Sequence, residues 1–188
     1  GFDISNSNEL NLISKYNPEI TYNSNPNFEK LLLDENIIYD INNEDDISES
    51  IKLKVNISLR LNSDSIVDNT SRFGFKESEV IQLLDTYETI KSLHIHLGTE
   101  ANSQSHYLKI LERLKSMVST IKSARPFKLN IGGGFTHLSE QEIAEVVAFS
   151  QKILPDHTIY FEPGRWVSNS SGIFLSRVLN IKRSKAHS

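Results

Sequence analysis

The sequence predicts an α/β fold: a parallel (β/α)8 barrel of the TIM type that is incomplete by one strand. Short β-like runs alternate with helical patterns along the chain, which is typical of βαβ units and a parallel sheet. The 188 residues suffice for one sizeable domain, and no second composition class interrupts the alternation. An open doubly wound sheet is the alternative, but the glycine spacing does not match a dinucleotide-binding fingerprint.

Seven runs have the length and composition of strands. Each is short, apolar or alternating, and followed by a helical pattern or by turn residues. In chain order they are Phe2–Ile4, Ile20–Tyr22, Ile37–Asp40, Val55–Leu61, Leu93–Leu97, Lys128–Ile131 and Thr158–Phe161.

The helices between these runs differ in quality. The strongest pattern covers Ser105–Ser123, where apolar residues recur at three- and four-residue steps. Another covers Glu140–Ile153 and begins with the capping box formed by Ser139 and Glu142. The remaining candidates are Lys76–Thr89, Asn27–Leu33 after an Asn-Pro cap, and the weak, acidic stretch Asn42–Ser50, which also fits an irregular solvated segment.

Composition excludes several classes of function. The net charge of -4 and the lack of a Lys/Arg cluster argue against a nucleic-acid partner. No apolar stretch is long enough to span a membrane, so no membrane partner is expected. Zero cysteines exclude disulfides, thiolate metal sites and a cysteine nucleophile, and no metal site is predicted. A cytoplasmic location is compatible with this composition.

Three predicted strands end in residues suited to chemistry. Leu93–Leu97 lies in "LHIHLGT", which places His94 and His96 on one face. Lys128–Ile131 ends in "GGGF", and Thr158–Phe161 ends in "EPGRW". Because functional groups of a barrel gather at the carboxyl ends of its strands, these motifs are expected to meet. Bare amides beside an arginine favour a phosphate site.

Each motif also has a plainer interpretation. The three glycines fit a flexible connection, and Pro-Gly after a strand is an ordinary turn. Glu162 and Arg165 fit a surface ion pair, and a lone strand histidine is usually structural. Their joint placement favours a site for the cluster. His94 is either a residue that supports the site from behind or a core residue, and the core interpretation is preferred. Arg60 and Arg72 are weaker candidates for the same site.

In order and spacing, "GFDIS", "SRFGF", "HIHLGT", "LNIGGGF" and "EPGR" resemble the pyridoxal-phosphate barrel of the ornithine/diaminopimelate/arginine decarboxylase family, which has the alanine-racemase-like fold. The resemblance covers nearly the whole chain and leans slightly toward the diaminopimelate branch. It implies the cofactor pyridoxal 5'-phosphate and an amino-acid substrate.

The resemblance also implies roles for residues around the phosphate. Gly132, Gly133 and Gly134 would bind it through their amides. Thr99 stands where the family usually has serine and would keep that contact, and Arg165 would lie nearby.

Around the cofactor ring, the resemblance implies that His96 stacks on the ring and Glu162 faces its nitrogen. Gly164, in the EPGR motif, would also contact the cofactor. A glutamate at this nitrogen favours decarboxylation, because alanine racemases of this fold place an arginine there.

The family's Schiff-base lysine is not found in this chain. It belongs to a strand that should precede residue 1, and the family's C-terminal β domain, which completes a site shared across a homodimer, should follow. We therefore expect a fragment, with the barrel at 1–170 and the start of the β domain or its linker at 171–188. Such a fragment is expected to be inactive alone. An inactive cofactor-binding module or regulatory homologue is the alternative, and an unrelated phosphate-binding barrel is less favoured.

Overall fold

The computed structural model describes residues 1–16, 18–23, 36–53, 55–63, 73–98, 103–122, 126–172 and 177. The strands are β1 (Phe2–Ile4), β2 (Ile20–Tyr22), β3 (Ile37–Ile41), β4 (Asn56–Leu61), β5 (Ile90–Ile95), β6 (Lys128–Asn130) and β7 (Thr158–Tyr160). The α-helices are α1 (Ser7–Ile13), α2 (Glu44–Leu53), α3 (Glu77–Thr86), α4 (Gln104–Val118), α5 (Glu140–Ile153) and α6 (Gly164–Ser168). Two short 3₁₀ turns are η1 (Ser14–Tyr16) and η4 (Phe135–His137).

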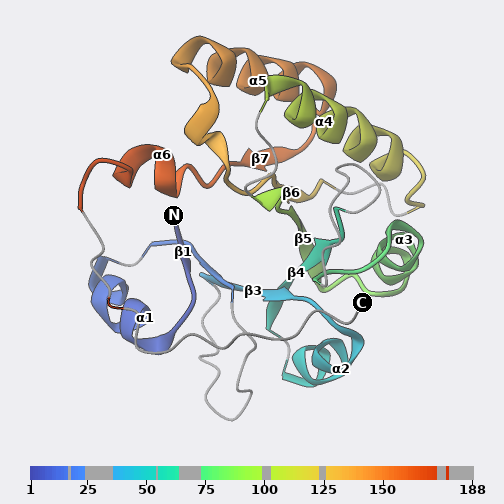
Figure 1. Ribbon diagram of the computed structural model, residues 1–188. Helices are drawn as coiled ribbons and strands as arrows, with labels where there is room; N and C mark the ends of the chain where they lie inside the picture. Colours follow the sequence, from blue (N-terminus) through green and yellow to red (C-terminus); the bar gives the residue numbers. More distant parts are fainter. Residues whose placement is uncertain are drawn as a thin grey trace, which may run out of the picture.

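The strands form one parallel sheet in the order β1-β2-β3-β4-β5-β6-β7. The sheet curls so that helices α2 to α5 lie on its outer side (Figure 1). A doubly wound sheet would reverse its strand order at a switch point, and this sheet does not. The incomplete barrel is therefore confirmed, with β1 and β7 as its two edges.

The two faces of the sheet differ in chemistry because side chains alternate along each strand. The outer face is apolar and packs against the helices; Tyr39, Leu59 and Leu93 are buried there. The inner face is polar. In the pairing register, Asp40 lies opposite Ser58, which lies opposite Ser92 on the next strand. The core therefore lies between sheet and helices, and hydrogen-bonding groups fill the barrel interior.

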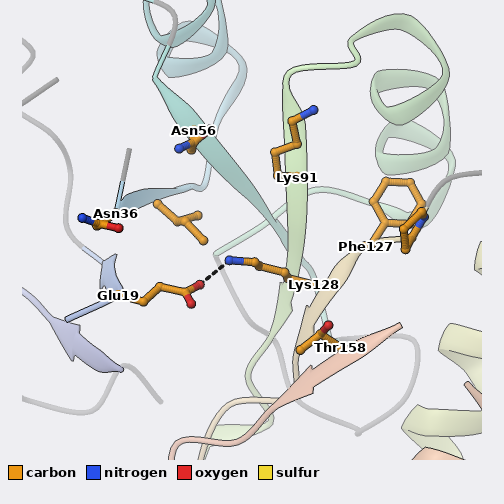
Figure 2. A pocket seen from close by; sticks show the side chains of 9 residues that line it. Glu19, Asn36, Asn56, Lys91, Phe127, Lys128 and Thr158 are labelled. Atoms are coloured by element: carbon orange, nitrogen blue, oxygen red, sulfur yellow. Dashed lines mark hydrogen bonds and ion pairs between the residues drawn. The ribbon is translucent and has the colours of Figure 1, made fainter. Parts of the chain in front are cut away.

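A cavity of about 410 Å³ opens at the amino ends of the strands (Figure 2). An ion pair between Lys128, which begins β6, and Glu19, just before β2, spans it. The hydroxyl of Tyr160 on β7 lies 3.3 Å from both carboxylate oxygens of Glu19. These contacts tie the β2 side of the sheet to β6 and β7, which supports the curl.

The helices mostly follow their sequence patterns. Helix α5 has the predicted bounds and capping box: the Glu142 amide donates to Ser139 Oγ over 3.3 Å, and Ser139 N–H donates to Glu142 Oε2 over 2.8 Å. Helix α4 ends at Val118, before the predicted Ser123. There the Thr120 hydroxyl donates to the Met117 carbonyl, which competes with continuing the helix.

Two predicted elements differ from the structure, and a third lies outside the described residues. The irregular-segment interpretation of Asn42–Ser50 is wrong, because α2 covers Glu44–Leu53 and buries Ile47. Glu44, Asp45 and Asp46 occupy its first turn, where negative charge stabilises a helix. Strand β5 begins at Ile90, three residues before the predicted Leu93. The predicted helix Asn27–Leu33 lies outside the described residues.

Candidate active site

A second cavity, of about 660 Å³, opens at the carboxyl ends of the strands. Six of the predicted site residues line it, and they come from the ends of β5, β6 and β7: His96, Gly133, Gly134, Glu162, Gly164 and Arg165. Residues of β1 and β2, including Asp3 and Thr21, line the same space. Thr99 and Arg72 lie outside the described residues. The curl of the sheet thus brings motifs far apart in sequence into one cavity.

The glycines after β6 are required by backbone conformation and by close packing. Gly132 and Gly134 have positive φ angles of 69° and 97°, which favour glycine. Gly133 has ordinary φ, but a Cβ there would lie 2.7 Å from the carbonyl oxygen of Glu162. Gly132 is buried and is not among the residues lining the cavity.

Two residues that line the cavity have backbone amides with no acceptor among the described residues. Within the described part of the chain, no atom accepts a hydrogen bond from the amides of Gly133 and Gly134. The buried Tyr107 hydroxyl donates to the Gly133 carbonyl over 3.0 Å. Because the peptide is planar and trans, this contact turns the Gly134 N–H away from Tyr107. Burial raises the pKa of Tyr107 to about 12, so it remains a donor. Two free amides in a cavity fit an anion such as phosphate.

His96 is held as a neutral ring with one defined tautomer. The Gly98 amide donates to its Nδ1 over 2.9 Å, so in the neutral ring Nε2 carries the proton. Burial, followed by the nearby charges of His94, Arg60 and Arg165, lowers the pKa of His96 to about 4. A neutral imidazole at the cavity wall offers a flat face rather than a positive charge.

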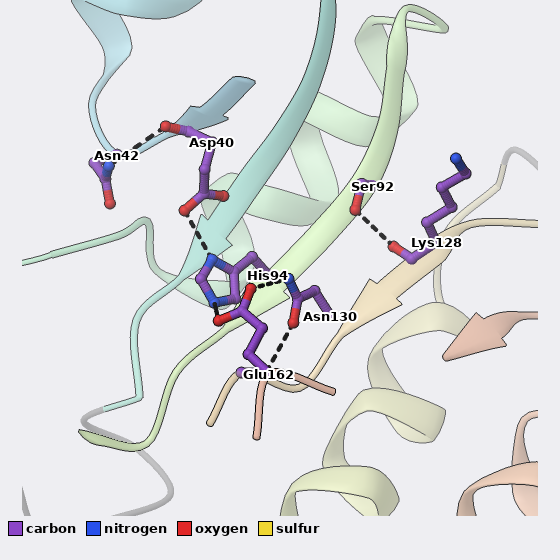
Figure 3. A network of polar contacts seen from close by, with 8 residues as sticks. Asp40, Asn42, Ser92, His94, Lys128, Asn130 and Glu162 are labelled. Carbon is purple, nitrogen blue, oxygen red and sulfur yellow. Dashed lines mark hydrogen bonds and ion pairs between the residues drawn. The ribbon is translucent and has the colours of Figure 1, made fainter. Parts of the chain in front are cut away.

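Glu162 is fixed by β6. Its amide donates to the Gly132 carbonyl over 2.9 Å, and its Oε1 accepts from Nδ2 of Asn130 (Figure 3). Asn130 Oδ1 in turn accepts from the Gly132 amide over 2.9 Å, which determines which way the Asn130 side chain points. One asparagine therefore links the glycine run to the Glu162 carboxylate.

His94, interpreted from sequence as a core residue, is fully buried and has a charged partner. Its Nδ1 lies 2.8 Å from Asp40 Oδ2, and its Nε2 lies 3.9 Å from Glu162 Oε2. Its ring meets that of His96 edge to face. The core interpretation of His94 is correct in that the side chain is buried. It did not foresee the nearby carboxylates of Asp40 and Glu162.

The arginines occupy different places. Arg165 is exposed in α6 at the cavity rim, and no ion pair joins it to Glu162 among the described side chains. Arg60 lies opposite His94 in the strand register, with its guanidinium 5.3 Å from the centre of the Phe73 ring. Arg60 affects the site through its charge, since it does not line the cavity.

Sequence reasoning missed Asp3, Asp40, Asn130 and Tyr107. Asp3 lines the cavity, and burial together with the charges of Glu162 and Asp40 raises its pKa to about 7, although its side chain still reaches solvent. The period-two alternation places Asp40, His94 and Asn130 on the inner face of the sheet, so their polar character was an available signal.

The described residues contain no group of three or more His, Asp or Glu side chains arranged to hold a metal ion. None of the described helices has both the length and the apolar character needed to cross a membrane.

Comparison with known proteins gives a consistent result. Residues 1–169 match the family model described as "Pyridoxal-dependent decarboxylase, pyridoxal binding domain". The diaminopimelate decarboxylase of Bacteroides thetaiotaomicron is 22% identical over 130 residues, which cover 60% of this chain and 34% of the relative. That of Helicobacter pylori is 25% identical over 164 residues, covering 74% and 40%.

Solved structures show the same fold. The lysine/ornithine decarboxylase of Vibrio vulnificus, solved with cadaverine, superposes with a TM-score of 0.69 at 18% identity, covering 89% of this chain and 50% of that one. The chain thus spans between about a third and a half of the proteins it matches.

Proposed function

The chain belongs to the pyridoxal-dependent decarboxylases, and from this premise we propose that it is the cofactor-binding barrel of a decarboxylase that acts on an amino acid. Pyridoxal phosphate is the cofactor of this family. One observation carries the proposal: groups suited to a phosphate, an aromatic ring and a ring nitrogen line one cavity. When bound, the cofactor acts as an electron sink for the charge left by decarboxylation.

The phosphate is assigned to the glycine run. The free amides of Gly133 and Gly134 would donate to its oxygens, whereas the Gly132 amide, which the resemblance assigns to the same phosphate, donates to Asn130 Oδ1. Arg165 at the rim would add a positive charge. Thr99, outside the described residues, is assigned to the same phosphate on the family pattern.

The ring is assigned to His96 and Glu162. A neutral His96 would stack on the ring without repelling a protonated ring nitrogen. Glu162 would face that nitrogen and keep its proton in place, with Oε1 oriented by Asn130. Gly164, which follows Glu162 and Pro163, leaves the rim open because no atom lies within 4 Å of where its Cβ would be.

The Schiff-base lysine is assigned to a segment outside this chain. Among the described residues that line the cavity at the carboxyl ends of the strands there is no lysine. Lys91 and Lys128 line the other cavity, at the amino ends. By itself this fragment is therefore expected to be inactive. A parent protein without such a lysine would be an inactive cofactor-binding module, and the reading frame upstream of residue 1 distinguishes the two.

Four further features belong to the proposal. The relatives are named diaminopimelate decarboxylases, which favours that substrate class. A homodimer is proposed on the family pattern, as is a boundary between the barrel at 1–170 and a β domain beginning in 171–188. Cytoplasmic location is proposed because a chain with no cysteine is compatible with a reducing compartment.

The test uses the full-length protein. Loading with pyridoxal phosphate, reduction with borohydride and peptide mass spectrometry should label one lysine upstream of residue 1. Release of CO₂ should then be measured with diaminopimelate, lysine, ornithine and arginine. Saturable cofactor binding without labelling or CO₂ release would favour the inactive module. A specific label on a lysine of this chain would contradict the assignment of the Schiff-base lysine to a segment outside it.

A further inference from the structure

His94 has no role in the proposed function, yet it lies between two carboxylates inside the barrel. Its side chain on β5 is completely buried, Asp40 on β3 contacts Nδ1, and Glu162 after β7 faces Nε2 (Figure 3). The imidazole therefore bridges a buried acid and the acid assigned to the cofactor.

Hydrogen bonding in this bridge is incomplete. Within the described part of the chain, His94 Nε2 and Asp40 Oδ1 are buried without a hydrogen-bond partner. An unsatisfied buried polar atom is costly, typically about 1–3 kcal/mol. Glu162 Oε2, at 3.9 Å, is the carboxylate oxygen that Nε2 faces, and Oε1 of the same carboxylate is occupied by Asn130.

The geometry selects one protonation state of the ring. A neutral His94 protonated at Nδ1 would direct its Nε2 lone pair at Glu162. A neutral ring protonated at Nε2 would set the Nδ1 lone pair 2.8 Å from Asp40 Oδ2. Only the imidazolium presents a donor to both carboxylates.

The charges around His94 agree with this choice. Burial acts to lower the pKa of His94, but Asp40 and Glu162 outweigh both burial and the opposing Arg60 of β4, so the pKa is raised. Just after the end of β5, His96 is neutral and meets His94 edge to face. On β1, Asp3 adds a further carboxyl group.

We propose that His94 is a positioning residue: an imidazolium anchored by Asp40 that holds one oxygen of the Glu162 carboxylate while Asn130 holds the other. This inference rests on the proposed function, in which Glu162 faces the ring nitrogen. Both oxygens of Glu162 are then held by β5 and β6, which fixes the orientation of the carboxylate. The buried positive charge also offsets the repulsion between Asp40 and Glu162.

The first test needs no cofactor and no substitution of His94. ¹⁵N NMR of the histidine rings is recorded against pH for the cofactor-free full-length protein and for Glu162→Gln and Asp40→Asn. His94 should carry protons on both nitrogens at pH 7, and each substitution should lower its titration midpoint by about one unit or more. A neutral His94 at pH 7, or a midpoint that Glu162→Gln leaves unmoved, would overturn the proposal.

The second test measures the consequence for turnover. His94→Gln should lower kcat by about tenfold or more, by analogy with residues that orient metal ligands, and leave the Kd for pyridoxal phosphate within about twofold, because the phosphate contacts are untouched. His137→Gln, at an exposed histidine, is the matched control and should change neither quantity. An unchanged kcat in His94→Gln would overturn the positioning role. If this variant does not fold, the NMR titration decides.

The two tests separate this inference from the function on which it rests. The histidine titration reports the bridge without cofactor, whereas pyridoxal phosphate binding and CO₂ release report the function. Suppose that His94 carries protons on both nitrogens and its midpoint shifts in Glu162→Gln, but the protein does not bind pyridoxal phosphate. That result would contradict the proposed function and support the bridge. Cofactor binding and turnover with an uncoupled, neutral His94 would support the function and overturn the bridge.

Discussion

Asn130 donates a hydrogen bond from Nδ2 to Oε1 of Glu162 over 2.5 Å, which joins the end of β6 to the carboxylate that follows β7. The same side chain accepts from the Gly132 amide, so one residue supports both the phosphate and ring-nitrogen ends of the proposed site. Asn130 is buried, and its two contacts form only in this orientation.

Replacing Asn130 with alanine tests this link. The substitution leaves the Gly132 amide without its acceptor and removes a donor to Glu162, which should lower the free energy of unfolding by about 1–3 kcal/mol. Urea denaturation monitored by circular dichroism measures the change. Asn11→Ala, at an exposed position of α1, is the control and should stay within about 0.5 kcal/mol of the wild type. Equal losses in both variants would contradict the linking role.

Replacing Gly133 with alanine tests the close approach of the two strand ends. The new Cβ would lie 2.7 Å from the Glu162 carbonyl, so the backbone has to move, and both stability and phosphate affinity should fall. Gly172→Ala is the matched control, because nothing lies within 4 Å of its Cβ position. Unfolding and titration with pyridoxal phosphate measure the two effects. Retained affinity in Gly133→Ala would argue against a phosphate at these amides.

His96 makes the free energy of unfolding depend on pH in the acidic range. The folded-state pKa of His96, about 4, lies below the ordinary histidine value of 6.5, so the unfolded chain takes up the proton first as the pH falls. Stability attributable to neutral His96 is complete above pH 6.5 and declines toward pH 4. In cofactor-free His96→Gln the loss of unfolding free energy across this window should be smaller than in wild type. Identical pH profiles would show that His96 titrates normally.

Asp3 acts in the opposite direction. Its pKa is raised from 3.8 to about 7, so the folded chain binds this proton more tightly than the unfolded chain, and stability falls as the pH rises through that window. For the 188-residue chain, Asp3→Asn should therefore raise the melting temperature at pH 8 and change it little near pH 3.5. A stabilisation that is the same at both pH values would rule out the titration of Asp3 as its source.

The sequence predicted the fold well because parallel strands and their helices produce distinct periodic patterns. Strands β1, β2 and helix α5 have the predicted bounds. Strand β5 was predicted too short because Lys91 and Ser92 interrupt its apolar pattern, although their backbone pairs in the sheet. Alternation of polar and apolar residues along a strand predicts which face of the sheet each side chain occupies. It does not show which backbone groups pair with a neighbouring strand, because that pairing forms only in the folded sheet.

The site was predicted in part. Glycines, Glu162 and Arg165 belong to compact motifs, so they were found, and the structure places most of them in one cavity. The link through Asn130 and the bridge through Asp40 and His94 join strands that are distant in sequence. The local sequence does not indicate how far apart these residues lie in space. Their contacts become apparent only when the strands are paired in the folded sheet.

The most direct measurement is ¹⁵N NMR of pyridoxal phosphate, labelled at its ring nitrogen and bound to the full-length protein. We expect a protonated nitrogen in the wild type and loss of that proton in Glu162→Gln, with the cofactor still bound by the glycine amides. The same nitrogen resonance in both proteins would contradict the assignment of Glu162 to the ring. A cofactor that does not bind the wild type would contradict the site as a whole.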